Sequence, residues 1–238
     1  FAGSLDLTLV WPDGYDEITG LAGFNGKLII FGRKSIIVYT GAEDPLTMVL
    51  EDAFSGVGCV EAQTIQSIGN DILYLSDTGL RSLSRSTIAS ETALPDSDVS
   101  NNVREDLLSA VNEEQLLEGA GQISAEYYPE QALYLLSFWS TGNTYAFDVR
   151  GRLEDGTFRV TTWTASPFKV THRAQDGTLY VGGNYGVATY GGFLDGADTY
   201  AFVYESPALT FGDPARLKFI KSIRPTLVGG SGQSAVVG

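Results

Sequence analysis

Residues that perform nucleophilic or acid–base chemistry are scarce in this chain. It contains one histidine, His172, and one cysteine, Cys59. A serine hydrolase needs a base beside its nucleophile, but no Gly-x-Ser-x-Gly segment occurs, and His172 lies next to an expected strand as an ordinary surface histidine. Cys59 could pair with His172 as a nucleophile, but a thiol that follows a glycine turn is typically small and buried. These residues predict no catalytic site and no hydrolase, transferase or redox activity.

Patterns that bind metals or phosphates are also incomplete. A zinc site needs more ligands than one Cys and one His supply. The acidic pairs Asp96-Ser97-Asp98 and Asp195-Gly196-Ala197-Asp198 could hold calcium, although turns and helix starts use the same residues. Glycines 20, 23 and 26 precede a strand-like run and not a helix, as do glycines 182, 183 and 186, so neither set is a phosphate loop. We predict no metal site and no cofactor.

One enzymatic alternative stays open. Some glycosidases are β-propellers that use acidic residues with a group of arginines, and the chain has ten arginines. The segment Asp176-Gly177-Thr178-Leu179 resembles part of the Asp box of sialidases but lacks its Ser-x-Asp start and its aromatic end. We interpret this segment as a hairpin turn. A propeller glycosidase or polysaccharide-binding protein remains the alternative function.

Charge is distributed unevenly along the chain. The net charge is −14, which disfavours a protein that grips nucleic acid, because affinity for phosphates comes from clustered Lys and Arg. Residues 91–130 hold ten acids and one base. Residues 215–238 hold no acid and four bases, which we predict to contact a partner: Arg216, Lys218, Lys221 and Arg224. No apolar run approaches the roughly 18 residues of a membrane span, and a single cysteine excludes an intrachain disulfide.

Internal repeats indicate the fold. Four segments share one form, a polar turn, an apolar run, a second turn and another apolar run, which together predict a β-hairpin. The predicted hairpins cover residues 28–39, 72–83, 133–149 and 178–190. Leucines 28, 73, 133 and 179 anchor them at separations of 45, 60 and 46 residues, and a propeller blade occupies about 40–45 residues. We predict an all-β chain, a complete or partial β-propeller of four-stranded antiparallel blades over residues 1–238; a β-sandwich is the alternative.

The longest gap between anchors contains the one good helix pattern. We expect this helix between about residues 101 and 118, with Asn102 and Glu105 as a capping box. Its apolar stripe is Val103, Leu107 and Val111. Residues 88–120 therefore read as a helical insertion between blades. Its acids, Glu105, Asp106, Glu113, Glu114 and Glu118, could line a channel or face solvent.

Further strands are expected outside the hairpins, at residues 47–50, 157–163, 200–204 and 217–223. The two ends look unfinished as a propeller. We predict strands over residues 1–12 and 206–238 whose partners lie elsewhere, as in a fragment of a longer protein.

Several segments resemble one protein family. They are residues 18–32 (ITGLAGFNGKLIIFG), 35–39 (SIIVY), 56–59 (GVGC) and 72–81 (ILYLSDTGLR). They resemble the tail nozzle of short-tailed bacteriophages, also called tail tubular protein B, and the related packaged-DNA stabilisation proteins. The resemblance is good over residues 15–90 and weaker towards residue 230.

The resemblance implies a virion protein. Such a protein is made in the host cytoplasm and forms a ring, a hexamer, at the tip of the viral tail. The ring contacts adjoining tail or adaptor proteins, retains the packaged double-stranded DNA and conducts it during ejection without binding it specifically. No catalytic residues carry over from the family at these motifs.

Overall fold

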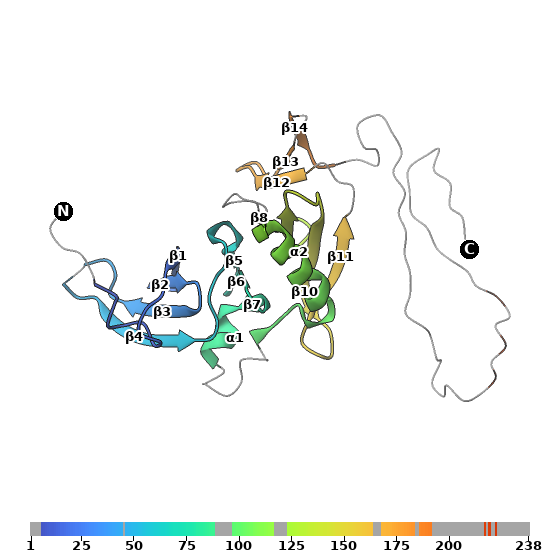
Figure 1. The fold of residues 1–238 in the computed structure, drawn as a ribbon. Coiled ribbons are helices and arrows are strands. Elements are labelled where there is room, and N and C mark those ends of the chain that lie inside the picture. Colours follow the sequence, from blue (N-terminus) through green and yellow to red (C-terminus); the bar gives the residue numbers. More distant parts are fainter. Residues whose placement is uncertain are drawn as a thin grey trace. The chain divides into compact units, whose positions relative to one another are not determined.

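The computed structural model describes residues 6–44, 46–88, 97–116, 123–163, 168–183 and 186–191, with residues 217, 219 and 222. The chain divides into two compact units, Phe1–Tyr190 and Gly191–Gly238. All the described strands and helices belong to the first unit (Figure 1).

The described strands form four antiparallel sheets that follow one another in chain order. The first sheet consists of β1 (Ile18–Phe24), β2 (Lys27–Gly32), β3 (Ser35–Thr40) and β4 (Val49–Ser55). The second consists of β5 (Gln66–Ile68), β6 (Asp71–Ser76) and β7 (Gly79–Ser82). The third consists of β8 (Ile123–Tyr128), β9 (Leu133–Phe138), β10 (Thr144–Arg152) and β11 (Phe158–Trp163). The fourth consists of β12 (Phe168–Arg173), β13 (Leu179–Gly183) and β14 (Gly186–Thr189).

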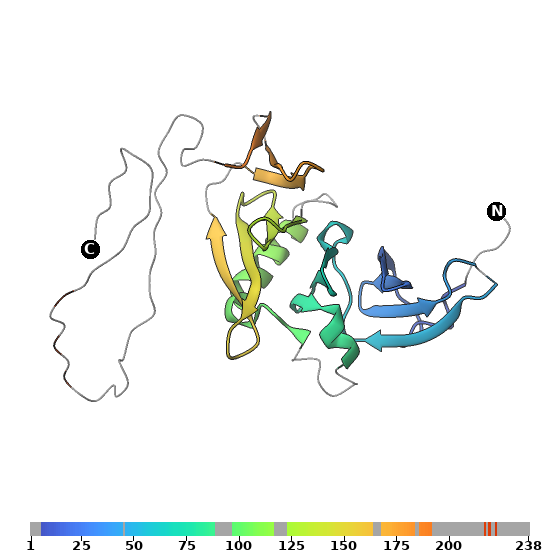
Figure 2. The same cartoon turned by 180° about the vertical axis from the view of Figure 1, so that it is seen from behind.

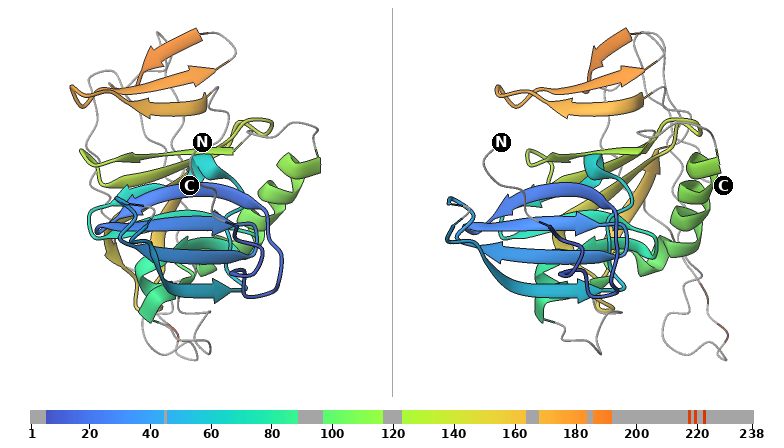
Figure 3. Two further views of the ribbon diagram at one scale, coloured as in Figure 1. Left: turned by 90° about the vertical axis from the view of Figure 1, so that its left-hand side faces the viewer. Right: turned by 60° about the vertical axis from the view of Figure 1, so that its left-hand side comes forward.

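All four predicted hairpins are confirmed. They are β2–β3, β6–β7, β9–β10 and β13–β14, one in each sheet. Figure 3 shows the strands of the first sheet side by side in chain order. The all-β class is therefore correct, and the described residues form four sheets and not the two facing sheets of a β-sandwich.

Each sheet packs on the next through alternating side chains, because successive residues of a strand point to opposite faces. In β6, Ile72 and Tyr74 belong to a buried cluster shared with the first sheet, whereas Leu73 and Leu75 belong to one shared with the third. In β9, Leu135 packs instead with Leu179 of the fourth sheet. The second and third sheets are thus buried on both faces, which explains their continuous apolar runs.

A short segment completes the second sheet where the sequence gave no sign of a strand. Asp98 forms an isolated antiparallel bridge with Arg81 of β7, and the Val99 N–H donates to the Leu80 carbonyl at 3.0 Å. The Val99 carbonyl in turn accepts from Phe158 at the start of β11, also at 3.0 Å. This segment therefore joins the second and third sheets through backbone hydrogen bonds.

The helices lie between strands of successive sheets. They are the short η1 (Ala62–Thr64), α1 (Leu83–Ile88), the short η3 (Asn101–Val103) and α2 (Arg104–Leu116). The α2 helix lies within the predicted range, and Figure 2 shows it from behind. Its buried stripe contains Leu107 and Val111 as expected, with Val103 partly buried against the same cluster.

The predicted capping box of α2 is wrong. Asn102 lies in η3, and its side-chain amide donates to the Phe158 carbonyl at 3.0 Å. Glu105 lies in the first turn of α2 and is exposed. A tertiary contact with β11 therefore takes the group that local capping would have used.

The predicted strand at the N-terminus is also wrong for its described part. Residues 6–12 form turns, in which the N–H groups of Val10 and Trp11 both donate to the Leu7 carbonyl. A helical turn puts residues four apart on one side, so Leu7 and Trp11 are buried together against Ile30 and other residues of the first sheet. The segment covers a sheet face and does not extend the sheet.

Two other predicted strands lie almost wholly outside the described residues. Residues 200–204 are not described at all. Within residues 217–223, the described positions Leu217, Phe219 and Ser222 are exposed and are not in a strand. Residues 157–163 agree with β11, and the strand expected at 47–50 begins two residues later, as β4.

Candidate functional site

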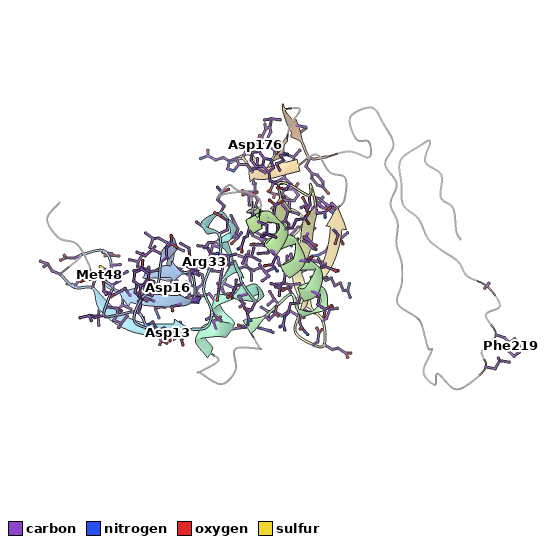
Figure 4. The ribbon with its side chains drawn as sticks, in the orientation of Figure 1. Asp13, Asp16, Arg33, Met48, Asp176 and Phe219 are labelled. Carbon is purple, nitrogen blue, oxygen red and sulfur yellow. The ribbon has the colours of Figure 1, made fainter. Side chains whose placement is uncertain are left out.

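The predicted partner-contact residues Arg216, Lys218, Lys221 and Arg224 lie outside the described residues. Phe219, which lies between them in the sequence, is exposed (Figure 4). The polar groups that the structure does describe therefore have to be judged one cluster at a time.

A repeated sequence marks the third and fourth sheets and was missed by the sequence analysis. Residues 152–160 and 173–181 share the pattern Arg-x-(Glu/Gln)-Asp-Gly-Thr-(Phe/Leu)-x-Val. Both copies form the same turn, in which the Asp carboxylate accepts from the Thr N–H at 3.0 and 2.9 Å. The glycines have φ of +84° and +86°, which only glycine adopts without strain. The segment around Asp176 (Figure 4) is thus a hairpin turn, as predicted.

The first residue of each repeat links its sheet to the preceding one. Arg173 donates three hydrogen bonds to Glu130, which follows β8 in the third sheet, at 2.6 to 3.0 Å. This contact lowers the pKa of Glu130. Arg152 lies 3.8 Å from Asp71 of the second sheet and stacks over the Phe158 ring. These ion pairs orient neighbouring sheets, and their partial exposure limits what each contributes to stability.

A buried polar network ties α2 to the second sheet. The Asp98 carboxylate accepts from the Ser100 N–H and hydroxyl at 2.8 and 2.9 Å and from the Arg104 guanidinium. Beside it, Arg81 donates to the Ser97 hydroxyl at 2.8 Å, and burial lowers the pKa of Arg81. Asp98, one half of a predicted calcium pair, therefore serves a structural network.

A second buried carboxylate ties α2 to the third sheet. Glu114 accepts from the Ser140 N–H at 2.5 Å, from the Ser140 hydroxyl at 2.9 Å and from the Thr141 N–H at 3.3 Å. These donors lie in the turn between β9 and β10. The expectation that Glu114 faces a channel or solvent is therefore wrong, because the turn supplies the donors that make burial of its charge affordable. Glu105, Asp106 and Glu113 remain exposed on the helix.

His172 and Cys59 are not brought together. His172 is exposed on β12, with its Nδ1 3.6 Å from the Glu126 carboxylate of β8. Burial raises the pKa of Glu126, and His172 partly opposes that shift. Cys59 is fully buried in the cluster between the first and second sheets, where burial raises its pKa to about 11. Neither has the environment of an activated nucleophile or its base.

The segment around Cys59 is a tight crossing between two sheets. The Cys59 N–H donates to the Gly32 carbonyl at 2.8 Å. A Cβ atom at Gly58 would lie 2.2 Å from the backbone of Arg33, so only glycine fits there. On the other side of the same turn, the Asp16 carboxylate accepts from the Arg33 and Lys34 N–H groups at 3.0 and 2.8 Å (Figure 4).

No group of three or more His, Cys, Asp or Glu within the described ranges is placed to hold a metal ion. The second predicted calcium pair, Asp195 and Asp198, lies outside those ranges. Among the helices that the structure describes, none is long and apolar enough to span a membrane.

Comparison with models of known protein families gave no match, and no curated protein sequence matched the chain. The geometry of the described residues therefore carries the functional argument together with the sequence resemblance.

Proposed function

We propose that this chain is a virion structural protein, a subunit of the tail nozzle of a short-tailed bacteriophage. Its four sheets are consecutive blades of a β-propeller. The subunit takes part in a six-fold ring that contacts adjoining tail or adaptor proteins. The ring retains packaged double-stranded DNA and conducts it during ejection, and the chain has no catalytic role.

The observation that carries this proposal is the serial packing of the four sheets. Each sheet has the up-and-down order of a propeller blade, and each buries one face against the next. Propellers repeat this unit around an axis, which leaves only short, protected strand edges. The Asp98 bridge supplies the fourth position of the second sheet, as a four-stranded blade requires.

The residues that carry the resemblance perform the tasks that blade packing demands. Gly58 allows the chain to cross from the first sheet to the second against the backbone of Arg33. Gly20 of β1 faces Ile65 so closely that a Cβ atom would lie 2.5 Å from its side chain. The quoted motifs therefore belong to the contact between the first two sheets, which favours a shared fold with the nozzle family.

The charge distribution suits a conduit. A basic wall would bind phosphates and stall the genome, whereas an acidic wall repels the duplex within roughly 8–10 Å at physiological salt. The exposed face of α2 offers Glu105, Asp106 and Glu113. Its one base, Arg104, is already bound to Asp98.

Electron microscopy of the native assembly that contains this chain tests the proposal. We expect a closed ring on the tail axis, with the four sheets of each subunit arranged in chain order around a local propeller axis. A chain located away from the tail, or a monomer that cleaves or binds glycans, would contradict the nozzle function and favour the glycosidase or polysaccharide-binding alternative.

A further inference from the structure

The first and fourth sheets each have one face that no other described sheet covers. The second and third sheets are covered on both faces. On the first sheet, the outer face is centred on Ile30 and Ile37, which Leu7 and Trp11 cover. On the fourth sheet, Thr171 and Val181 are buried, and the residues that alternate with them are exposed. The two ends of the series are therefore open.

The outer face of the fourth sheet is apolar. Val170 pairs with Gly182, which pairs with Val187, so these three residues share one face. Val170 is 40% exposed and Val187 is 76% exposed. Tyr180, two residues before Gly182 and on the same face, is 37% exposed. A small residue between two exposed valines makes a shallow apolar surface, which we call the fourth-sheet face.

The strand at the edge of this sheet is unprotected. All four residues of β14 are exposed, and none is charged or a proline. Natural sheets usually shield an exposed edge strand with charges, bulges or proline. The edge strand β4 of the first sheet, by contrast, carries Glu51 and Asp52. The composition of β14 fits a strand that is covered in the working molecule.

The outer face of the first sheet is also partly apolar. Leu21 pairs with Ile30 and Leu50 pairs with Tyr39, so both leucines lie on the face that Leu7 and Trp11 only partly cover. Leu21 is 62% exposed and Leu50 is 44% exposed. The covering segment adds an exposed side chain of its own, Leu9. We call this surface the first-sheet face.

We propose that the first-sheet face of one copy of this chain binds the fourth-sheet face of another. The occupant is a second copy because the two surfaces are complementary in charge as well as apolar. Residues 6–55, which build the first sheet and its cover, contain eight acids and three bases, a net charge of −5. Residues 168–191 contain two bases and one acid, a net charge of +1 with His172 neutral.

This charge difference selects a head-to-tail contact. Two first-sheet faces would bring like charges of −5 together, which disfavours a symmetric pairing of that surface. A contact between two different surfaces generates a closed ring where the rotation closes and a filament where it does not. The inference rests on the proposed nozzle function, since it names the surfaces through which subunits of the ring meet.

Self-association of the full chain tests the contact, measured by sedimentation velocity and mass photometry over a range of concentrations. We expect the wild-type chain to form oligomers. Val187→Asp on the fourth-sheet face and Leu21→Asp on the first-sheet face should each give a monomer. Leu116→Asp is the matched control, because this leucine is 84% exposed on α2 and belongs to neither face. It should assemble as the wild type does.

A mixture of the two variants makes the test specific. A head-to-tail contact needs one intact copy of each face, so equal amounts of Val187→Asp and Leu21→Asp should form a one-to-one dimer and nothing larger. Circular dichroism should show that each variant keeps its strands. Persistent self-association of either variant alone would overturn the proposal in favour of a symmetric contact.

Two further results separate this inference from the nozzle function. Rings that form equally well from both variants would overturn the contact and leave the nozzle function intact. A wild-type chain that stays monomeric at every concentration would also overturn the contact, because these faces would then meet other residues. In that case, electron microscopy of the native assembly still decides the nozzle function independently.

Discussion

At the scale of single residues, glycine positions decide whether successive sheets can meet. Gly58 and Gly23 have the same side chain but opposite surroundings. A Cβ atom at Gly58 would meet the Arg33 backbone at 2.2 Å, whereas one at Gly23 would meet nothing within 4 Å. Backbone atoms cannot rotate out of the way, so the two sites should respond differently to the same methyl group.

We predict that Gly58→Ala lowers the free energy of unfolding by more than about 2 kcal/mol, because overpacking at a rigid site forces the two sheets apart. Gly23→Ala is the control and should change it by no more than about 0.5 kcal/mol. Urea unfolding followed by tryptophan fluorescence measures both. Equal stability of the two variants would show that the crossing between the sheets is looser than the structure indicates.

Cys59 gives a second prediction at this scale. Burial raises its pKa from 9.0 to about 11, so the folded state holds the thiol proton more tightly than the unfolded state. The resulting stabilisation is complete below pH 9 and is lost as the pH rises to about 11, by up to about 3 kcal/mol. The Cys59→Ala variant should lack this loss between pH 8 and pH 11. Parallel pH dependences in wild type and variant would contradict the shift.

At the scale of elements, two buried carboxylates hold α2 in place. Asp98 lies before the helix and Glu114 near its end, and each accepts several hydrogen bonds from a neighbouring sheet or turn. Burial of a carboxylate is costly unless such donors are present. The helix is therefore positioned by polar contacts at both ends as well as by its apolar stripe.

We predict that Glu114→Ala destabilises the chain by about 2–3 kcal/mol, because Ser140 and Thr141 lose their charged acceptor in a buried site. The adjacent Glu113→Ala is the control; Glu113 is exposed, and the change should stay within about 0.5 kcal/mol. Hydrogen exchange should show faster exchange in α2 and in the β9–β10 turn of the Glu114 variant alone. Unchanged protection there would mean that the apolar stripe suffices.

Sequence reasoning succeeded where the signal was local. The four hairpins follow from apolar runs beside turn residues, and α2 follows from Leu107 and Val111 one turn apart. It failed where a distant partner decides. Asn102 turns to Phe158 instead of capping its helix, Asp98 pairs with β7 as a single residue, and Glu114 is buried by a turn 26 residues away. None of these partners is visible in a local pattern.

At the scale of the whole molecule, charge governs how the chain meets DNA. The net charge is −14, yet residues 215–238 carry four bases and no acid. A conduit must not hold its cargo, so these bases suit an acidic neighbouring subunit, where charges at the rim of an interface steer docking. The other reading, a basic grip on DNA, would give strong and salt-dependent binding.

We predict that the wild-type chain binds duplex DNA no more tightly than nonspecific proteins do, with a dissociation constant above about 10⁻⁵ M at physiological salt. Lys218→Glu with Lys221→Glu should weaken ring formation or docking to the tail and leave this DNA affinity unchanged. Lys27→Glu with Lys34→Glu is the control, because it makes the same change in net charge in the first sheet and in its β2–β3 turn. Fluorescence anisotropy with labelled duplex and particle counting by electron microscopy give the two readouts. Tight DNA binding by the wild type, abolished by the first double change and not by the second, would replace the conduit with a protein that grips the genome through its basic end.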